Sequence, residues 1–282
     1  MIDLHTHSNA SDGEFLPRVL IEKAARIGIK TIALTDHDTV FGLAEAEAAA
    51  KDHGICFIPG AELEIDTVLP GEFHLLGLGL NHITDELNAA LIQLKGARER
   101  RNLAMIEKIH AAGISVDYEE IKSLAGHIVG RPHFGTYLVN KKIAKNHEQA
   151  FHRWLAKGRP FFVPKEGLEF EKAVHIIHAC GGIAILAHPM SLYVSWGQIP
   201  GLVTALKEKG LDGIEAWHPT ARINDCKRLE TLGSSLGLYI TAGSDFHGSA
   251  RPERKLGFTA GNKKITEEFI PNILKTSLKL VY

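Results

Sequence analysis

The feature that most constrains the fold of this 282-residue chain is a repeated order of helical segment, glycine and short apolar strand. Apolar residues at helical spacing predict helices at residues 17–27, 41–53, 170–180, 199–209 and 224–236, each ending at a glycine. Short apolar and β-branched runs predict strands at residues 2–4, 31–34, 56–62, 73–78, 183–187, 213–216 and 238–242. This order is typical of βα units that build a parallel sheet.

Ionisable residues at the strand ends favour a closed barrel over an open, doubly wound sheet. An open nucleotide-binding sheet carries a glycine fingerprint, but the segment GLG at residues 77–79 lacks the third glycine and no helix follows it. Nearly every predicted strand instead delivers an imidazole or a carboxylate, mostly at its C-terminal end, where α/β barrels keep their active sites. These residues are His5, His7, His37, Glu62, His74, His188, His218, Asp245 and His247.

The alternation of strands and helices breaks between residues 85 and 165. One long helix is predicted at residues 85–112, and shorter helices at 117–124, 132–142 and 147–157. The segment from Lys95 to Lys165 holds 14 Lys and Arg against 6 Asp and Glu, a net charge of +8, which leaves −9 on the rest of the chain. We interpret residues 85–165 as a basic helical insertion domain, and residues 1–84 and 166–282 as the barrel. An anionic substrate facing the insertion explains this asymmetry, and a solvated lysine-rich helical face is the alternative.

Further features of the sequence indicate the compartment. Cys56, Cys180 and Cys226 are odd in number, widely spaced and without a CxxC pair, which is typical of free thiols in a reducing compartment. No apolar run approaches the ~18 residues that a membrane helix needs. The first residues show neither a charged leader nor the apolar core of a signal peptide. We therefore expect a soluble cytoplasmic protein.

Several strand-end residues stand in short alternating motifs that suit metal binding. The segment HTH at residues 5–7 is extended, so that both imidazoles share a face and can point into one site. The segments TDHD (35–38) and GSDFH (243–247) repeat this alternation, and GAE (60–62) and AHP (187–189) complete the set. One such motif is common by chance, but five at strand ends indicate a metal site. Imidazoles and carboxylates without thiolates suit Mn²⁺, Fe²⁺ or Zn²⁺ and disfavour a structural zinc site.

These motifs, in this order, resemble those of the polymerase and histidinol phosphatase (PHP) family. The resemblance covers nearly the whole chain and includes the segment FHLLGLG at residues 73–79. It implies a distorted (β/α)7 barrel, here with a helical insertion domain. It also implies two or three divalent metal ions, with Mn²⁺ expected and Zn²⁺ or Fe²⁺ as alternatives.

The resemblance further implies a role for each matching residue. By position, the first metal would take His5, His7, Glu62 and Asp245, the second Asp12, His37 and His247, and a third would share Glu62 and add His74 and His188. Metals held by Glu62, Asp245 and His247 would acidify a bound water to a hydroxide that attacks phosphorus. The same cations would neutralise phosphate oxygens as charge builds up. No ligand position is substituted, so we expect an active hydrolase.

The insertion carries a second candidate site. The segment GRPH at residues 130–133 places a guanidinium and an imidazole at a predicted helix start, where phosphate binds readily. A subgroup of the family has a helical insertion with a similar Arg-x-His, which implies phosphatases of 3′,5′-bisphosphonucleosides and enzymes that trim short RNA from the 5′ end. We expect Arg131, His133 and Arg159 to bind substrate phosphate, with Lys165 as a further candidate. The alternative is that Arg131 only caps the insertion structurally.

Other residues of the same types are interpreted differently. His147 and His152 stand at i, i+5, which does not match the i, i+4 spacing of the HExxH zinc motif. Glu64 is an alternative to Glu62 on the same strand face, and His218 is a candidate substrate contact outside the family's ligand set. Further histidines that we interpret as surface residues are His53, His82, His110, His175 and His178.

The leading hypothesis is a metal-dependent phosphoesterase acting on a small nucleotide, such as a 3′,5′-bisphosphonucleoside, or on the 5′ end of a short RNA. No duplex DNA, membrane or obligatory protein partner is expected. Histidinol-phosphate phosphatase is the first alternative, although so small a substrate needs no basic helical cap. A noncatalytic PHP module is disfavoured by the complete ligand set. A metal-dependent amidohydrolase would show a lysine at a strand end, and none of the predicted strand ends has one.

Overall fold

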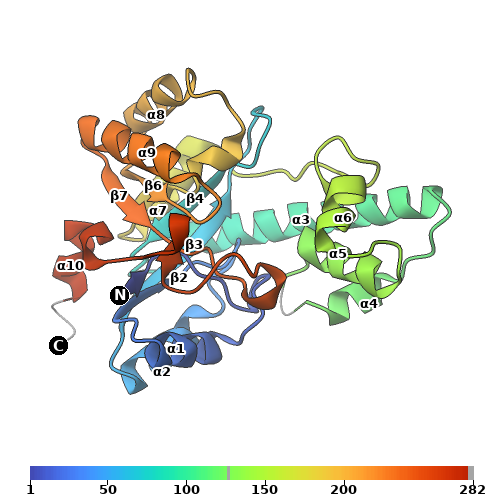
Figure 1. Cartoon of the computed structure of the whole chain (residues 1–282), viewed down its shortest axis with the longest axis horizontal. Helices are drawn as coiled ribbons and strands as arrows, with labels where there is room; N and C mark the ends of the chain where they lie inside the picture. Colours follow the sequence, from blue (N-terminus) through green and yellow to red (C-terminus); the bar gives the residue numbers. More distant parts are fainter. Residues whose placement is uncertain (126–127, 279–282) are drawn as a thin grey trace.

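In this computed structural model, which describes residues 1–125 and 128–278, seven strands form one curved sheet (Figure 1). They are β1 (Ile2–Asp3), β2 (Thr31–Leu34), β3 (Cys56–Glu64), β4 (His74–Leu78), β5 (Ile183–Leu186), β6 (Gly213–Trp217) and β7 (Tyr239–Ala242), and they lie in chain order. Beyond the ends of β1 and β7, Thr6 and Phe246 form a parallel bridge, and the N–H of His7 donates to the Phe246 carbonyl at 3.0 Å. The sheet thus closes on itself, which confirms the predicted barrel.

One strand runs against its neighbours. β4 is antiparallel to both β3 and β5, whereas the other neighbouring pairs are parallel. Only residues 65–73, nine in all, connect β3 to β4, and a parallel crossover needs about a dozen or more. The expectation of a purely parallel sheet is therefore wrong at β4. In the antiparallel register His74, the first residue of β4, pairs with Glu64, the last residue of β3, so both lie at the same end of the barrel.

Helices cover the outside of the barrel and end close to the predicted positions. They are α1 (Pro17–Arg26), α2 (Leu43–Asp52), α7 (Phe170–Ala179), α8 (Ile199–Glu208), α9 (Ile223–Ser235) and α10 (Asn272–Leu278). A glycine with positive φ follows each of the first five within two residues, for example Gly28 at 81° and Gly210 at 100°. Glycine adopts this conformation without steric cost, so it ends each helix and turns the chain toward the next strand.

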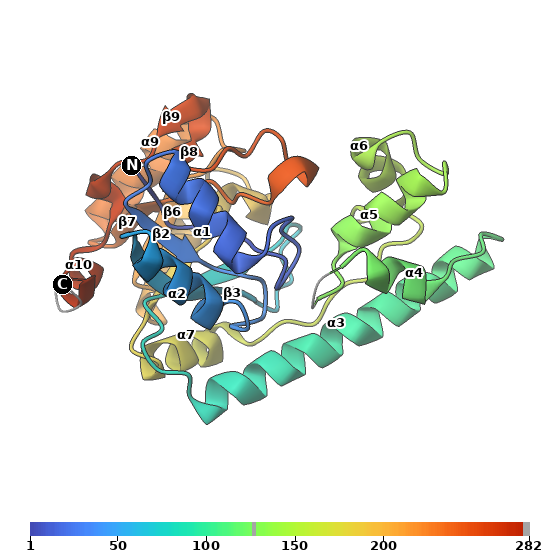
Figure 2. The same cartoon turned by 90° about the horizontal axis from the view of Figure 1, so that it is seen from below.

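The insertion is a helical body beside the barrel, with a core of its own (Figures 1 and 2). It consists of α3 (Asp85–Ala111), α4 (Tyr118–Ser123), α5 (Arg131–Asn140), α6 (His147–Ala150) and the π-helical turn η1 (Phe151–Leu155). Phe134 and Phe161 are among the largest side chains in this core and are fully buried. Around the barrel the short elements are β8 (Phe258–Thr259), β9 (Lys263–Lys264), η2 (Pro189–Leu192), η3 (Gly248–Ala250), η4 (Ala260–Asn262) and η5 (Glu267–Phe269).

The long helix α3 is shared between the two bodies. Leu87 and Leu94 in its first part pack into the barrel core, whereas Met105 and Ile109 in its last part pack into the core of the insertion. Figure 2 shows α3 running from the barrel to the far side of the insertion. The division of the chain at residues 85 and 165 stays a prediction. Among residues 1–125 and 128–278, no helix is both long and apolar enough to cross a membrane.

Candidate metal centre

The predicted metal ligands converge at one end of the barrel. His5 and His7 follow β1, Asp12 precedes α1, His37 follows β2, Glu62 lies in β3, His188 follows β5, and Asp245 and His247 follow β7. His74 opens β4, and the reversal of that strand brings its side chain to the same end. All nine residues are buried except Asp12 and His37, which are partly exposed.

The first group is the set that the resemblance assigns to a first metal. The ligand atoms of His5, His7, Glu62 and Asp245 all lie within 4.8 Å of one another. The Nε2 atoms of the two imidazoles are 3.1 Å apart, and Glu62 Oε2 is 3.3 Å from each of them. Asp245 Oδ1 is 3.1 Å from His7 Nε2. Two imidazoles facing two carboxylates form a donor set that suits a divalent transition metal.

The second group contains His7, Asp12, His37 and His247, again within 4.8 Å of one another. Asp12 Oδ1 is 3.3 Å from His247 Nε2 and 3.9 Å from His37 Nε2. The resemblance assigns Asp12, His37 and His247 to a second metal and places His7 only in the first. In the structure His7 faces both groups, so the two groups share one imidazole.

Glu62 occupies the middle of the whole cluster. A third group joins it to His37 and His74, and its Oε1 is 2.9 Å from His74 Nδ1 and 2.8 Å from His188 Nε2. Its Oε2 is 3.0 Å from His37 Nδ1. Glu64, the alternative considered on the same strand, contacts only His74 among these histidines, at 3.3 Å. The central carboxylate is therefore Glu62.

The electrostatics of the cluster fit divalent cations. His7 Nδ1, Asp12 Oδ1 and Glu62 Oε2 are buried without a hydrogen-bond partner in the described part of the chain, although buried polar atoms are normally paired. Burial lowers the pKa of His7, but the close approach and the charges of Asp245 and Glu62 raise it to about 9. The carboxylates thus favour positive charge at this point. A cation between the facing donors satisfies both observations.

Three residues at the cluster hold a left-handed backbone. Asp38, His188 and Asp245 have φ values of 53°, 29° and 49°, and each such residue costs roughly 1–3 kcal/mol. Hydrogen bonds keep them in place, because the N–H of Asp245 donates to the His5 carbonyl at 2.8 Å and that of Asp38 to the Glu62 carbonyl at 2.9 Å. The fold therefore tolerates local strain where it aims His188 and Asp245 at the cluster and Asp38 at Arg98 and Lys165.

Glu215, which the sequence analysis did not identify, supports the ring of His5 and the backbone of His188. It lies in β6, and its Oε1 is 3.0 Å from His5 Nδ1. Its Oε2 accepts the N–H of His188 at 2.8 Å. A carboxylate behind an imidazole fixes the ring orientation and the nitrogen that faces the metal. The available signal was a single acid within the apolar strand GIEAW.

Asp3 and Asp36, also missed, shape the segments that carry the ligands. Asp3 accepts the N–H of Ser244 at 2.9 Å and that of His5 at 3.3 Å, so it ties the end of β1 to the segment after β7. Burial raises the pKa of Asp3 to about 6, although hydrogen bonds with Ser244 oppose this. Asp36 accepts both the N–H and the hydroxyl of Ser8, at 2.8 and 2.6 Å. Both acids therefore order the backbone around the first imidazoles.

Asp245 is held from a further side by His218 and Arg254. His218 Nε2 is 3.0 Å from Asp245 Oδ2, and Arg254 forms an ion pair with the same oxygen. The other ring nitrogen of His218 contacts Thr220 Oγ1 at 2.8 Å. His218 therefore lies within the cluster, and its role as a substrate contact stays a prediction. Arg254 comes from the loop before β8 and offers no sequence signal.

The insertion approaches the cluster at the start of α5. A methyl group added at Gly130 would lie 3.6 Å from Asp12 Oδ2 and 3.7 Å from Arg98 Nη1, so this backbone passes near the second group. His133 is 9% exposed, and its Nδ1 accepts the Gly130 N–H at 2.8 Å. His133 thus caps α5 immediately beside the cluster.

The two arginines expected to bind phosphate differ in their surroundings. Arg131 forms an ion pair with Glu72, which lies just before β4, so its guanidinium joins the insertion to the barrel. Arg159 lies in an exposed turn after η1, and no carboxylate in the described ranges pairs with it. Phosphate binding by Arg131, His133 and Arg159 stays a prediction.

A buried network also joins the insertion to the barrel. Asp38 Oδ2 is 2.5 Å from Arg98 Nη2 and 2.6 Å from Lys165 Nζ. Lys165 Nζ is in addition 2.7 Å from Glu64 Oε2. The charge of Lys165 is therefore already matched by two carboxylates.

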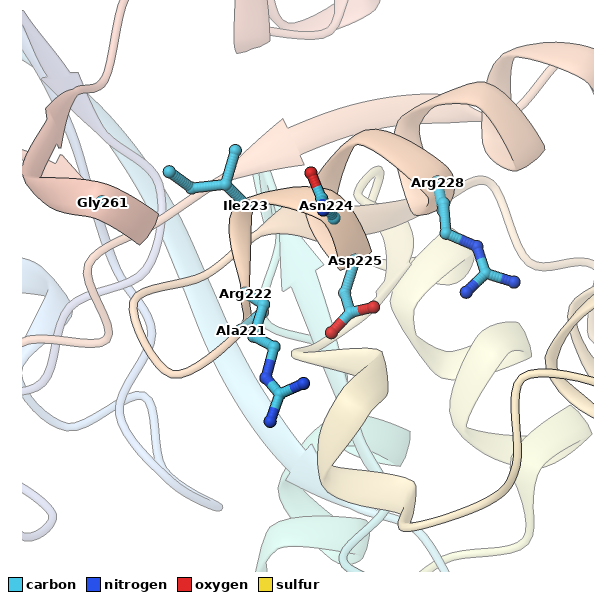
Figure 3. Close-up of a pocket in the computed structure, with 7 residues that line it drawn as sticks. All are labelled: Ala221, Arg222, Ile223, Asn224, Asp225, Arg228 and Gly261. Carbon is cyan, nitrogen blue, oxygen red and sulfur yellow. The ribbon is translucent and has the colours of Figure 1, made fainter.

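Histidines set aside by spacing lie away from the cluster. His147 contacts Thr136 Oγ1 at 3.1 Å within the insertion, and His178 contacts Asp212 Oδ2 at 2.7 Å. A surface hollow at the start of α9, beside Arg222 and Asp225, also contains none of the predicted ligands (Figure 3).

Comparison with known proteins agrees with this geometry. Residues 3–163 match the family model described as PHP domain. The chain is 37% identical to a 5′-3′ exoribonuclease of Haemophilus influenzae, over 87% of this chain and 89% of that protein. It is 33% identical to a 3′,5′-nucleoside bisphosphate phosphatase of Chromobacterium violaceum, over 92% of this chain and 91% of that protein.

Solved structures share the whole architecture. An amidohydrolase from Chromobacterium violaceum, with bound sulfate and no metal, superimposes with a TM-score of 0.88 at 31% identity, covering 99% of this chain and 96% of that one. A candidate metal-dependent phosphoesterase from Bifidobacterium adolescentis gives a TM-score of 0.85 at 25% identity, covering 97% and 95%. Together with a cluster that fits divalent cations, these likenesses identify a metal-dependent phosphoesterase. The chain belongs to the PHP domain family.

Proposed function

We propose that the protein hydrolyses a phosphate ester of a small nucleotide that carries a second phosphate, such as a 3′,5′-bisphosphonucleoside, or trims the 5′ end of a short RNA. The observation that carries this proposal is the nearness of the start of α5 to the cluster, since a methyl group added at Gly130 would lie 3.6 Å from Asp12 Oδ2. Arg131 and His133, next along that helix, then stand beside the reacting ester. The nucleotide and RNA activities named for two relatives support the same substrate class.

The proposed ligand sets are those that the family resemblance implies, with two or three divalent ions. The first ion takes His5, His7, Glu62 and Asp245, the second Asp12, His37 and His247, and the third Glu62, His74 and His188. Mn²⁺ is the expected ion, and Zn²⁺ or Fe²⁺ is the alternative, because imidazole and carboxylate donors suit all three.

Divalent ions at these positions would supply an acidified water as the nucleophile and would neutralise phosphate oxygens. The chain's own residues hold the arrangement. Glu62 contacts His7 of the first group and His74 of the third, and Glu215 fixes the ring of His5. In the proposal Arg131 orients the substrate by binding the phosphate that is not cleaved, through a charge-assisted and bidentate contact. Orientation of this kind raises the rate because the ester is held in line for attack.

The test is a substrate comparison with protein loaded with Mn²⁺. Hydrolysis is measured for adenosine 3′,5′-bisphosphate, a 5′-phosphorylated RNA trinucleotide, histidinol phosphate and p-nitrophenyl phosphate. We expect kcat/KM for one of the first two to exceed both controls by at least about tenfold, because only these substrates reach the insertion. Highest efficiency on histidinol phosphate would reject the nucleotide assignment.

A further inference from the structure

A third arginine, in the middle of α3, has two side-chain nitrogens without a partner in the described part of the chain. Arg101 of α3 is only 5% exposed, and its Nε and Nη2 atoms have no hydrogen-bond partner within residues 1–125 and 128–278. A buried guanidinium without a partner destabilises a fold, because it loses hydration and gains nothing in exchange. Its retention needs a reason outside the folded chain alone.

The neighbouring cations are already matched. Arg98 and Lys165 share the carboxylate network described above, and Arg131 pairs with Glu72. The charges of Arg98 and Arg131 act on Arg101. Burial, followed by these two charges, lowers the pKa of Arg101 to about 9, so the side chain still carries its proton at neutral pH. Arg101 is therefore the cation left over at this contact.

The position of Arg101 links it to the cluster. The charge of Glu64 acts on Arg101, and Glu64 Oε2 is 3.3 Å from His74 Nε2. Glu72, the partner of Arg131, is the other acid whose charge reaches it. Glu64, which contacts the predicted ligand His74, thus also acts electrostatically on Arg101 of α3.

We propose that Arg101 binds a phosphate oxyanion of the substrate remote from the metal ligands, next to the contact made by Arg131. The two unpartnered atoms, Nε and Nη2, form one edge of the guanidinium fork, and that edge matches two oxygens of a phosphate. This inference rests on the proposed function and deepens it, because it makes Arg101 a determinant of specificity for substrates with a second phosphate.

The first experiment compares Arg101→Met, Arg101→Lys and the control Arg100→Met. Arg100 is the next residue on α3, is exposed, and pairs with Glu166 at 2.6 Å. With Mn²⁺-loaded protein we expect Arg101→Met to lower kcat/KM for adenosine 3′,5′-bisphosphate at least about tenfold, mainly through KM. Turnover of p-nitrophenyl phosphate should change less than about twofold, as should both substrates in Arg100→Met. Arg101→Lys should recover only part of the loss, because an ammonium lacks the fork.

Thermal unfolding separates this role from a structural one. Removal of an unpaired buried charge should leave the unfolding midpoint of Arg101→Met equal to or above that of the unchanged protein. A lower midpoint together with equal losses on both substrates would overturn the proposal, because Arg101 would then support the fold.

A last measurement stands apart from the identity of the substrate. Inorganic phosphate should raise the unfolding midpoint of the chelated protein, and Arg101→Met should abolish that rise while Arg100→Met keeps it. If the unchanged protein shows no preference for bisphosphates, the proposed function fails, yet this loss in Arg101→Met would still support the anion site. An equal rise in all variants would reject the site.

Discussion

The barrel and the insertion hold their charged groups in different ways. In the barrel, buried imidazoles and carboxylates face one another, and three polar atoms of the cluster have no partner in the described chain. At the insertion, buried guanidinium and ammonium groups pair with acids of the barrel, as Arg98 does with Asp38, whereas the buried Arg101 is unmatched in the described chain. This difference supports the proposal that the barrel carries out the reaction and that the insertion recognises the substrate. Changes in the barrel should then affect every substrate, whereas changes in the insertion should affect only some.

The largest effect is expected from removal of the metals. Treatment with a chelator should abolish hydrolysis of every substrate, because the proposed nucleophile depends on them. The helical circular dichroism should persist, because the barrel and the insertion each have an apolar core. Cooperative loss of the helical signal on chelation would mean that the metals are structural. It would contradict the assignment of the reaction, and not only of the fold, to the metal cluster of the barrel.

The next test contrasts two acids of β3. Glu62→Gln removes the central carboxylate and should lower kcat/KM on both adenosine 3′,5′-bisphosphate and p-nitrophenyl phosphate by at least roughly a hundredfold, together with bound metal. Glu64→Gln, the matched control, should lose about tenfold or less, because Glu64 contacts only His74 among the ligands. Elemental analysis and steady-state kinetics check both. A larger loss in Glu64→Gln would show that Glu64, and not Glu62, is the central carboxylate.

A selective effect is expected at Arg131. Its replacement by alanine should lower kcat/KM on adenosine 3′,5′-bisphosphate by roughly ten- to a hundredfold, the value of a charge-assisted contact of ~1.5–3 kcal/mol. Turnover of p-nitrophenyl phosphate should change little. Arg159→Ala is the comparison variant, and we expect a smaller loss because Arg159 is exposed and unpaired in the described chain. Equal losses on both substrates in Arg131→Ala would show that Arg131 supports the fold or the metal centre.

The smallest effect concerns histidines of the insertion. His147→Ala should leave the metal content unchanged, because His147 contacts Thr136 and lies in none of the ligand groups. His247→Ala should lower it, because His247 faces Asp12 at 3.3 Å in the second group. Metal analysis of the two purified variants is the measurement. Equal metal content in both would contradict the assignment of metal binding to the barrel.

The sequence was most informative where geometry is repeated. Strand ends of a barrel meet at one mouth, so motifs after β1, β2, β5 and β7 were sufficient to bring their residues together. His74 was identified by its motif although a parallel sheet was expected. The connection between the two predicted strands, residues 63–72, is itself too short for a parallel crossover and was the available signal that β4 reverses. Arg254 was missed although its partner Asp245 is only nine residues earlier, because nothing in the loop before β8 indicates that it turns back onto that residue. Glu215 was missed because its partner His5 lies far away in sequence. The same holds for the pairing of Arg131 with Glu72, which depends on how the insertion stands against the barrel.

Helix α3 is anchored in the barrel at one end and carries the insertion at the other. Its residues up to Leu94 pack in the barrel core, and those from Met105 onward pack in the core of the insertion. At ~1.5 Å per residue, its 27 residues span about 40 Å. Gly96 follows the anchored part, and a glycine is where a helix bends with least resistance. If the insertion moves relative to the barrel, we therefore expect α3 to bend in the turn that precedes Arg98 and Arg101. A methyl group fits at Gly96, 3.5 Å from Arg100 Nη1, and would stabilise this turn of the helix by about 1 kcal/mol. The freedom of the insertion to move relative to the barrel thus depends on Gly96 having no side chain.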